Sequence, residues 1–144
     1  VYQQKAKEVI SRIKDVSELL ADVDLANRTE TKLRRIAYHS PCTLQHGQKL
    51  PGLVETILTK AGYELVQVDD AHLCCGSAGT YSVTQPEIAG QWLDNKLHHL
   101  QHHAPEIIAT ANIGCQLHLG SRAGVPVVHW VELLALDFVR RETD

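Results

Sequence analysis

The hydrophobic residues near the start of the chain recur at steps of three and four. Between residues 2 and 20 they are Tyr2, Ala6, Val9, Ile10, Ile13, Val16, Leu19 and Leu20. This spacing places them on one side of an α-helix and leaves polar residues on the other side. The pattern therefore predicts one amphipathic leading helix over residues 2–20, with a wide apolar stripe.

Four short apolar segments further along have the length and the residue types of β-strands. They cover residues 33–38, 63–68, 107–111 and 125–128. Pro41 stops any regular structure soon after the first segment, because proline has no backbone N–H to donate. The sequence therefore predicts four strands, the first of which runs directly into a turn.

Apolar residues at helical spacing follow each predicted strand. The predicted helices cover residues 50–61, 86–102, about 115 to 120 or 124, and 131–140, with one or two helical turns over 78–84. Pro51 suits a first helical turn, and Gly62 suits a helix end. The residues expected to face inward from the helix over 86–102 are Ile88, Trp92, Leu93, Leu97 and Leu100. Trp92 and Trp130 are both expected in the core.

Strands that alternate with helices are typical of a parallel sheet covered by helices. The sequence thus predicts an α/β fold with an open, mostly parallel four-stranded sheet and helices on both faces, in a Rossmann-like arrangement. Ligands bind such sheets outside the carboxyl ends of the strands, near the point where the strand order reverses. Every cysteine and one histidine follow predicted strands and are expected at this one edge, namely Cys42, Cys74, Cys75, Cys115 and His129.

The composition limits the class of protein. The chain has 144 residues, of which 44% are hydrophobic and 22% charged, as in one globular domain of ordinary size. A net charge of −3 gives no reason to expect nucleic acid or an anionic membrane as a partner. No apolar stretch is long enough to cross a bilayer, so no direct membrane span is predicted.

The cysteines are the candidate chemistry of the chain. Cys74 and Cys75 are adjacent, whereas Cys42 and Cys115 lie far from them in the sequence. Thiolates bind metals, and vicinal cysteines rarely pair with each other. The chain opens with no secretory signal sequence, so the four cysteines indicate metal-binding or redox thiols of a reducing compartment.

The cysteine pattern resembles a known family. Cys42, then Cys74-Cys75-Gly76, then Cys115 occur in the order of the cysteine-rich CCG domain. That domain occurs in the glycolate oxidase (glycolate dehydrogenase) iron–sulfur subunit, in heterodisulfide reductase, in lactate-utilisation proteins and in anaerobic glycerol-3-phosphate dehydrogenase. The segments 38–42, 74–81 and 112–119 are most similar to the C-terminal domain of the glycolate oxidase iron–sulfur protein. The resemblance covers roughly residues 33–140.

The resemblance implies a place in a larger electron-transfer complex. Without a ferredoxin-type cysteine run, the chain would be a single CCG domain over 1–144, a fragment of a longer iron–sulfur subunit, with a leading helix over 1–20 and strand–helix repeats over 33–140. The implied partners are a flavin-containing subunit, which oxidises glycolate to glyoxylate, and the remaining domains of the iron–sulfur subunit. The implied location is cytoplasmic, peripheral at the inner membrane through the complex.

The resemblance also implies a metal centre but no catalytic residue. The implied ligands are Cys42, Cys74, Cys75 and Cys115. They would hold an iron–sulfur cluster of the 4Fe–4S type, with zinc as the alternative. Where the family often has Cys-x-x-Cys, this chain has Cys-Gln-Leu-His at 115–118. His118 is either a substituted ligand, since imidazole binds zinc and can replace thiolate at iron, or the mark of a lost ligand.

Simpler interpretations exist beside these. Free cysteines are often buried merely as small hydrophobic residues. A run of histidines near the end of the helix over 86–102 has the i, i+4 spacing of a helical metal site, but a solvated helix end is the favoured interpretation. These histidines are His98, His99, His102 and His103. His39 and His129 are expected to be partly buried with satisfied hydrogen bonds, and Asp69 and Asp70 to be solvated loop residues.

Two hypotheses of function remain open. In the first, the chain is an electron-transfer module whose cysteines hold a metal centre. In the second, it is a structural or subunit-docking domain whose cysteine site holds zinc or is empty. Thiolates bind iron and zinc alike, so the sequence does not separate the two hypotheses, whereas metal analysis does.

Overall fold

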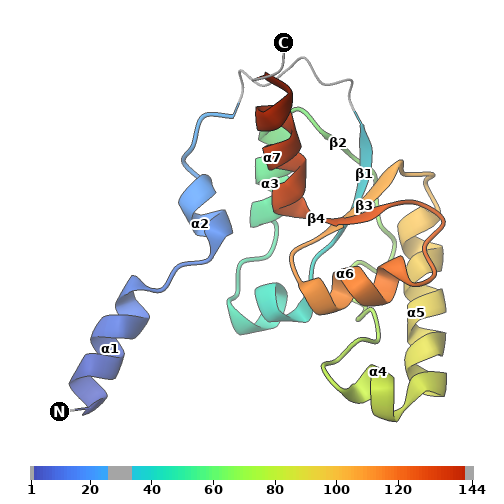
Figure 1. The fold of residues 1–144 in the computed structure, drawn as a ribbon, viewed down its shortest axis with the longest axis horizontal. Helices are drawn as coiled ribbons and strands as arrows, with labels where there is room; N and C mark the ends of the chain where they lie inside the picture. Colours follow the sequence, from blue (N-terminus) through green and yellow to red (C-terminus); the bar gives the residue numbers. More distant parts are fainter. Residues whose placement is uncertain (1, 26–33, 142–144) are drawn as a thin grey trace.

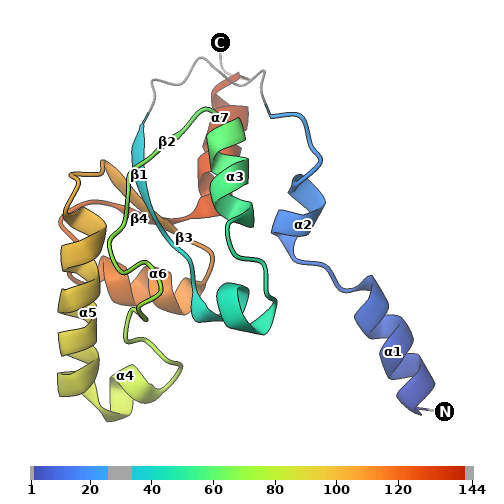
Figure 2. The same cartoon turned by 180° about the vertical axis from the view of Figure 1, so that it is seen from behind.

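The computed structural model describes residues 2–25 and 34–141, with side chains as far as residue 135. Figures 1 and 2 show its elements from two opposite sides. In chain order they are α1 (Tyr2–Arg12), α2 (Val16–Leu20), β1 (Arg35–His39), the π-helical segment η2 (Thr43–Gly47), α3 (Leu53–Lys60), β2 (Glu64–Leu65), α4 (Tyr81–Thr84), α5 (Pro86–Gln101), β3 (Ile107–Thr110), α6 (Ile113–Gly120), β4 (Val127–His129) and α7 (Trp130–Arg141).

In the described part of the chain, four parallel strands form one sheet in the order β2-β1-β3-β4. The central pair, β1 and β3, is in register from Ile36↔Ile107 to His39↔Thr110. The chain runs from β1 out to β2 and then crosses back to β3, so the strand order reverses between β1 and β3. The predicted parallel α/β sheet is confirmed, and its expected ligand edge lies where β1 and β3 end.

Helices cover both faces of this sheet, as predicted (Figures 1 and 2). Successive strand residues point to opposite faces, so Ile36 and Tyr38 of β1 pack in one core cluster and Ala37 packs in the other. The first cluster includes residues of α3 and α7, and the second includes residues of α5 and α6. Trp130 is 1% exposed in the first cluster, which confirms its place in the core.

The prediction of one helix over residues 2–20 was wrong. α1 ends at Arg12, and α2 begins at Val16. Asp15 caps the second helix, because its Oδ1 accepts a hydrogen bond from the Ser17 N–H at 2.9 Å and its own N–H donates to Glu18 Oε2 at 2.8 Å. The apolar period continues across this break, so periodicity alone missed it. None of the residues described in α1 is buried.

Several boundaries and one core residue also differ from the predictions. Trp92 is 44% exposed and Ile88 is 45% exposed, whereas Leu93, Leu97 and Leu100 are buried as expected. The helix predicted over 50–61 begins only after Gly52, whose φ of 77° is left-handed and ends the preceding turn. β2 is shorter than the segment 63–68.

The segment η2 was not predicted, and Leu33, where the first strand was expected to begin, lies outside the described residues. No helix among the residues the structure describes has the length and apolar character needed to span a membrane.

Candidate metal centre

The first cysteine follows the end of β1. Pro41 interrupts the strand, and its carbonyl oxygen accepts hydrogen bonds from the N–H groups of Leu44 and Gln45, both at 3.0 Å. These bonds turn the chain into η2 directly beyond the sheet edge. Cys42, at the start of that turn, is the most exposed of the four cysteines.

The last cysteine follows the end of β3, next to β1 in the sheet. The side chain of Asn112 caps α6 by accepting a hydrogen bond from the Cys115 N–H at 3.2 Å. Cys115 therefore lies in the first helical turn, with its sulfur directed back toward the strand ends. Adjacent parallel strands thus bring Cys42 and Cys115 to the same edge.

The vicinal cysteines lie on a loop that packs closely against α5. Gly76 has a φ of 89°, and a Cβ at this position would lie 2.6 Å from the carbonyl oxygen of Ala89 and 3.0 Å from Trp92 Cβ. Only glycine fits there without displacing the helix backbone. The Gly76 N–H also donates to Cys74 Sγ at 3.4 Å, which orients that thiol. Gly76 is therefore required by the path of the Cys74-Cys75 loop.

All four cysteines line one cavity of about 420 Å³ at the edge where β1 and β3 end. The other residues that line it come from the same three segments, near Pro41, Ser77 and Gly114. One water molecule takes up about 30 Å³ of liquid, so the cavity has room for a group of several atoms. The expected meeting of the four cysteines at the ligand edge is therefore observed, and it depends on the reversal of strand order.

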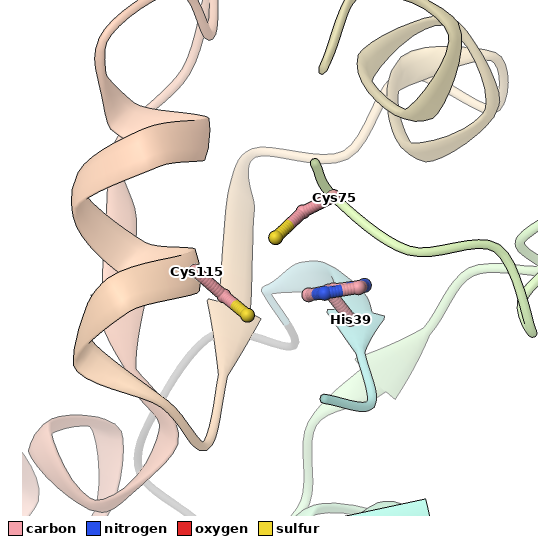
Figure 3. A group of neighbouring side chains, drawn as sticks. All are labelled: His39, Cys75 and Cys115. Carbon is pink, nitrogen blue, oxygen red and sulfur yellow. The ribbon is translucent and has the colours of Figure 1, made fainter. Parts of the chain in front are cut away.

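A buried histidine accompanies two of these thiols (Figure 3). The ligand atoms of His39, Cys75 and Cys115 all lie within 4.8 Å of one another. The His39 side chain is 1% exposed, and its ring nitrogens have no partner at ordinary hydrogen-bond distance among the described residues, although the ring lies close enough to Cys75 to lower the pKa of that thiol. His39 is therefore fully buried, and not partly buried as expected.

His39 is absent from the ligand set predicted from the sequence. The one local signal for it is its place as the last residue of β1, three positions before Cys42. A buried imidazole with two unpaired nitrogens costs stability unless something binds it. Its position beside Cys75 and Cys115 makes it part of the candidate site.

The two sulfurs nearest to His39 have opposite pKa shifts. The neighbouring Cys115 thiol and, to a smaller extent, the His39 ring lower the pKa of Cys75 below its ordinary value, against the opposing effect of burial. Cys75 in turn, together with burial, raises the pKa of Cys115. Burial also raises the pKa of Cys74. These shifts favour a thiolate, the form that binds a metal, within the Cys75–Cys115 pair.

His118 and His129, like His39, are not among the residues that line the cavity. His118 Nε2 is buried without a hydrogen-bond partner in the described part of the chain, and it lies 3.3 Å from where a Cβ on Gly76 would be. His129 ends β4 at the same sheet edge, where its Nδ1 accepts a hydrogen bond from the Val131 N–H at 3.5 Å. The structure thus brings the four cysteines and His39 together, and it places His118 behind the vicinal cysteine loop.

These donors fit a soft metal centre. Thiolate sulfur and imidazole nitrogen are ligands of iron–sulfur clusters and of zinc. The four thiols come from three segments that the fold holds independently, so the site is shaped before any group enters it. The volume of the cavity and the donor types at its edge fit a bound metal group of more than one atom.

Comparison with known proteins shows that this chain is similar in sequence to an iron–sulfur subunit and to lactate-utilisation proteins. The family described as "CCG: Cysteine-rich domain" matches residues 36–120. The chain is 47% identical over 134 residues to the glycolate oxidase iron-sulfur subunit of Escherichia coli (strain K12), which covers 93% of this chain and 33% of that protein. It is 31% identical over 143 residues to lactate utilization protein A of Geobacillus kaustophilus (strain HTA426), covering 92% and 59%.

A second protein named lactate utilization protein A, from Halalkalibacterium halodurans (strain ATCC BAA-125 / DSM 18197 / FERM 7344 / JCM 9153 / C-125), is 28% identical over 144 residues, covering 93% of this chain and 58% of that protein. The chain therefore spans a third of the glycolate oxidase protein and under two thirds of the lactate-utilisation proteins.

Proposed function

Because this chain belongs to the family of CCG cysteine-rich domains, we propose that it is a domain of an iron–sulfur subunit and that its cysteines hold the metal centre of an electron-transfer module. The main support for this proposal is that four cysteines from three distant segments line one cavity. The cavity lies at the edge of the sheet where the strand order reverses between β1 and β3. A protein that used these cysteines only as small core residues would have no reason to gather them around a cavity.

The proposed ligands are Cys42, Cys74, Cys75 and Cys115, with the His39 ring beside the last two. A bound iron–sulfur cluster supplies one-electron transfer, and its potential depends on burial and on nearby charges. The thiol of Cys115 and the His39 ring lower the pKa of Cys75, which favours its metal-binding form. Gly76 lets the loop that carries Cys74 and Cys75 approach α5 closely. We propose a cluster of the 4Fe–4S type as the bound group, with zinc as the alternative.

The larger assembly is proposed from the relatives. The Escherichia coli relative is named an iron-sulfur subunit of glycolate oxidase, and this chain corresponds to a third of its length. We infer that residues 1–144 form one domain of such a subunit. The proposed partners are the rest of that subunit and a flavin-containing subunit that oxidises a 2-hydroxy acid such as glycolate. A cytoplasmic complex peripheral at the inner membrane stays a prediction.

Metal analysis of anaerobically purified protein tests the proposal. We expect iron and acid-labile sulfide in the wild type and a sharp loss of both in Cys75→Ser, since serine is nearly isosteric but a poor ligand for a soft metal. Ser82→Ala, on α4 and outside the cavity lining, is the matched control and should retain both. Far-UV circular dichroism establishes that each variant folds.

Zinc alone, or no metal at all, in the anaerobic wild type would contradict the proposal. That result would favour the second hypothesis, a structural or subunit-docking domain. Iron content that is unchanged in Cys75→Ser, with a lower melting temperature, would show that Cys75 serves the core and not the metal. The same measurement on the full-length protein shows whether the other domains alter the site.

A further inference from the structure

A second group of metal-binding side chains lies outside the cysteine cavity. Asp69 follows β2, and His102 and His103 follow α5. Their ligand atoms lie within 4.8 Å of one another. Asp69 Oδ2 is 2.8 Å from His102 Nδ1 and 3.9 Å from His103 Nε2, so one carboxylate oxygen faces two imidazole rings.

These distances suit a shared ion. Zinc binds imidazole nitrogen and carboxylate oxygen at roughly 2.0–2.2 Å, so two ligands at a tetrahedral angle lie about 3.4 Å apart. The separations of 2.8 and 3.9 Å lie on either side of that value, and exposed side chains adjust by this amount through small rotations. The exposed fractions of 57%, 36% and 40% for His102, Asp69 and His103 leave room for water as a fourth ligand.

The loop that carries Asp69 is held in place without any ion. Gln67 Nε2 donates to Asp69 Oδ1 at 3.4 Å, which leaves Oδ2 to face the rings. Lys96, which is fully buried in α5, donates from Nζ to the carbonyl oxygens of Asp70 and Ala71. This contact fixes the loop against the helix whose end carries the histidines. Outer contacts of this kind orient metal ligands and strengthen binding.

Three of the four histidines in this run face aspartates of the loop after β2. His102 and His103 face Asp69, and His99 Nε2 lies 3.7 Å from Asp70 Oδ2. His98 instead stacks on His102, with the ring centroids 6.1 Å apart. The hydrogen bond to His102 lowers the pKa of Asp69. The interpretation as a plain solvated helix end therefore omits the partners that the loop provides.

We propose that Asp69, His102 and His103 form a binding site for a divalent transition-metal ion, with Zn²⁺ the ion that this donor set suits best. The site is separate from the cysteine cavity and does not depend on what that cavity holds. A bound ion ties the loop after β2 to the end of α5. That loop leads directly to Cys74 and Cys75, so the ion also braces the segment that carries the vicinal cysteines.

Zinc titration followed on the imidazole nitrogens tests this site directly. Zinc is added to the ¹⁵N-labelled chain at about pH 8, where histidine is neutral, beyond the amount that the cysteines take up. Long-range ¹H–¹⁵N spectra report each ring separately, so binding to the cysteines does not confuse the readout. We expect saturable shifts of His102 Nδ1 and His103 Nε2.

Two carboxylate variants make the matched comparison. Asp69→Asn should weaken the zinc affinity seen on His102 by about tenfold or more, the effect typical of altered metal ligands and their partners. Asp94→Asn is the control, because Asp94 is also an exposed aspartate but lies on α5 and pairs there with Arg122 at 2.8 Å. It should leave the affinity unchanged.

His103→Gln provides a second variant and should weaken binding in the same way as Asp69→Asn. If the His102 and His103 signals do not move with zinc, the site is refuted. Equal affinities of Asp69→Asn and Asp94→Asn would also refute it, because the three side chains would then form only a hydrogen-bonded ion pair. None of these outcomes depends on iron in the cysteine cavity.

Discussion

Lys96 Nζ donates a hydrogen bond to the Ala71 carbonyl oxygen at 2.9 Å, from a residue whose exposed fraction is 0%. A second bond, to the Asp70 carbonyl oxygen, measures 3.2 Å. The helix α5 thereby holds the loop that leads to Cys74 and Cys75. Burial lowers the pKa of Lys96, and the negative charge of Cys75 opposes that effect. A buried cation thus supports both the position and the charge of the cysteine loop.

Lys96→Met should lower the free energy of unfolding by about 1–3 kcal/mol, because two carbonyl oxygens lose a charged donor. Lys60→Met is the matched control, since Lys60 Nζ also donates to a carbonyl oxygen, that of Ala21 at 3.1 Å, but from an exposed side chain. It should cost no more than about 0.5 kcal/mol. Urea denaturation measures the free energy of unfolding of both variants. Equal decreases would show that burial of Lys96 gives its hydrogen bonds no extra contribution to stability.

Gly76→Ala should be more harmful than the same change at Gly79. Both glycines have positive φ, but a Cβ on Gly76 would meet the Ala89 carbonyl oxygen at 2.6 Å, whereas one on Gly79 would meet nothing within 4 Å. The left-handed conformation alone costs about 1–2 kcal/mol, and overpacking adds about 1–3 kcal/mol. Thermal or chemical denaturation of the two variants separates these contributions. Similar losses at both positions would rule out the clash.

His39→Leu should change metal content much more than stability. The metal-free variant should keep about the stability of the wild type, because leucine removes two buried nitrogens that have no ordinary hydrogen bond among the described residues, but also the ring that lowers the pKa of Cys75. The iron content of anaerobically prepared protein should fall. His129→Leu, at the end of β4 and outside the group of His39, Cys75 and Cys115, is the control and should keep its iron.

A loss of stability in metal-free His39→Leu would show that the ring already has a partner that leucine cannot replace. Unchanged iron content would place the ring outside the metal site. The two measurements therefore test the structural and the chemical role of His39 separately.

Glu55→Gln should stabilise the protein at neutral pH and not at acidic pH. Burial raises the pKa of Glu55, and its Oε2 has no hydrogen-bond partner in the described part of the structure. The folded carboxyl keeps its proton to a higher pH than the unfolded one, so its contribution to stability falls as the pH rises through the unfolded and then the folded pKa. The gap between variant and wild type should therefore grow from below about pH 4 to pH 7.

Urea denaturation at several pH values measures this gap. Glu64→Gln is the control, because the Glu64 carboxylate is 52% exposed and forms only a surface ion pair with Arg35 at 3.4 Å. Its effect should stay within about 0.5 kcal/mol. A pH-independent gap for Glu55→Gln would mean that burial of the charge is not the cause.

Local patterns in the sequence predicted the elements well and their ends less well. The alternation of strands and helices depends on the spacing of apolar residues within one segment, so Leu93, Leu97 and Leu100 were correctly assigned to the core. The break at Asp15 went unpredicted because its capping hydrogen bonds leave the apolar period intact. Trp92 was wrongly predicted to lie in the core. It belongs to the apolar side of the helix by its spacing, but it lies at the border of that side and is 44% exposed.

The sequence by itself determined that four cysteines follow strands of a parallel sheet, and hence that they share one edge. It could not determine which side chains join them. His39 meets Cys75 and Cys115 only because β1 and β3 are neighbours in the strand order, and Asp69 meets His102 only because α5 packs beside the loop after β2. These contacts join residues far apart in the chain, and their free energy depends on how whole elements pack. No local spacing of residues encodes that packing, so the tertiary structure alone decided both groups.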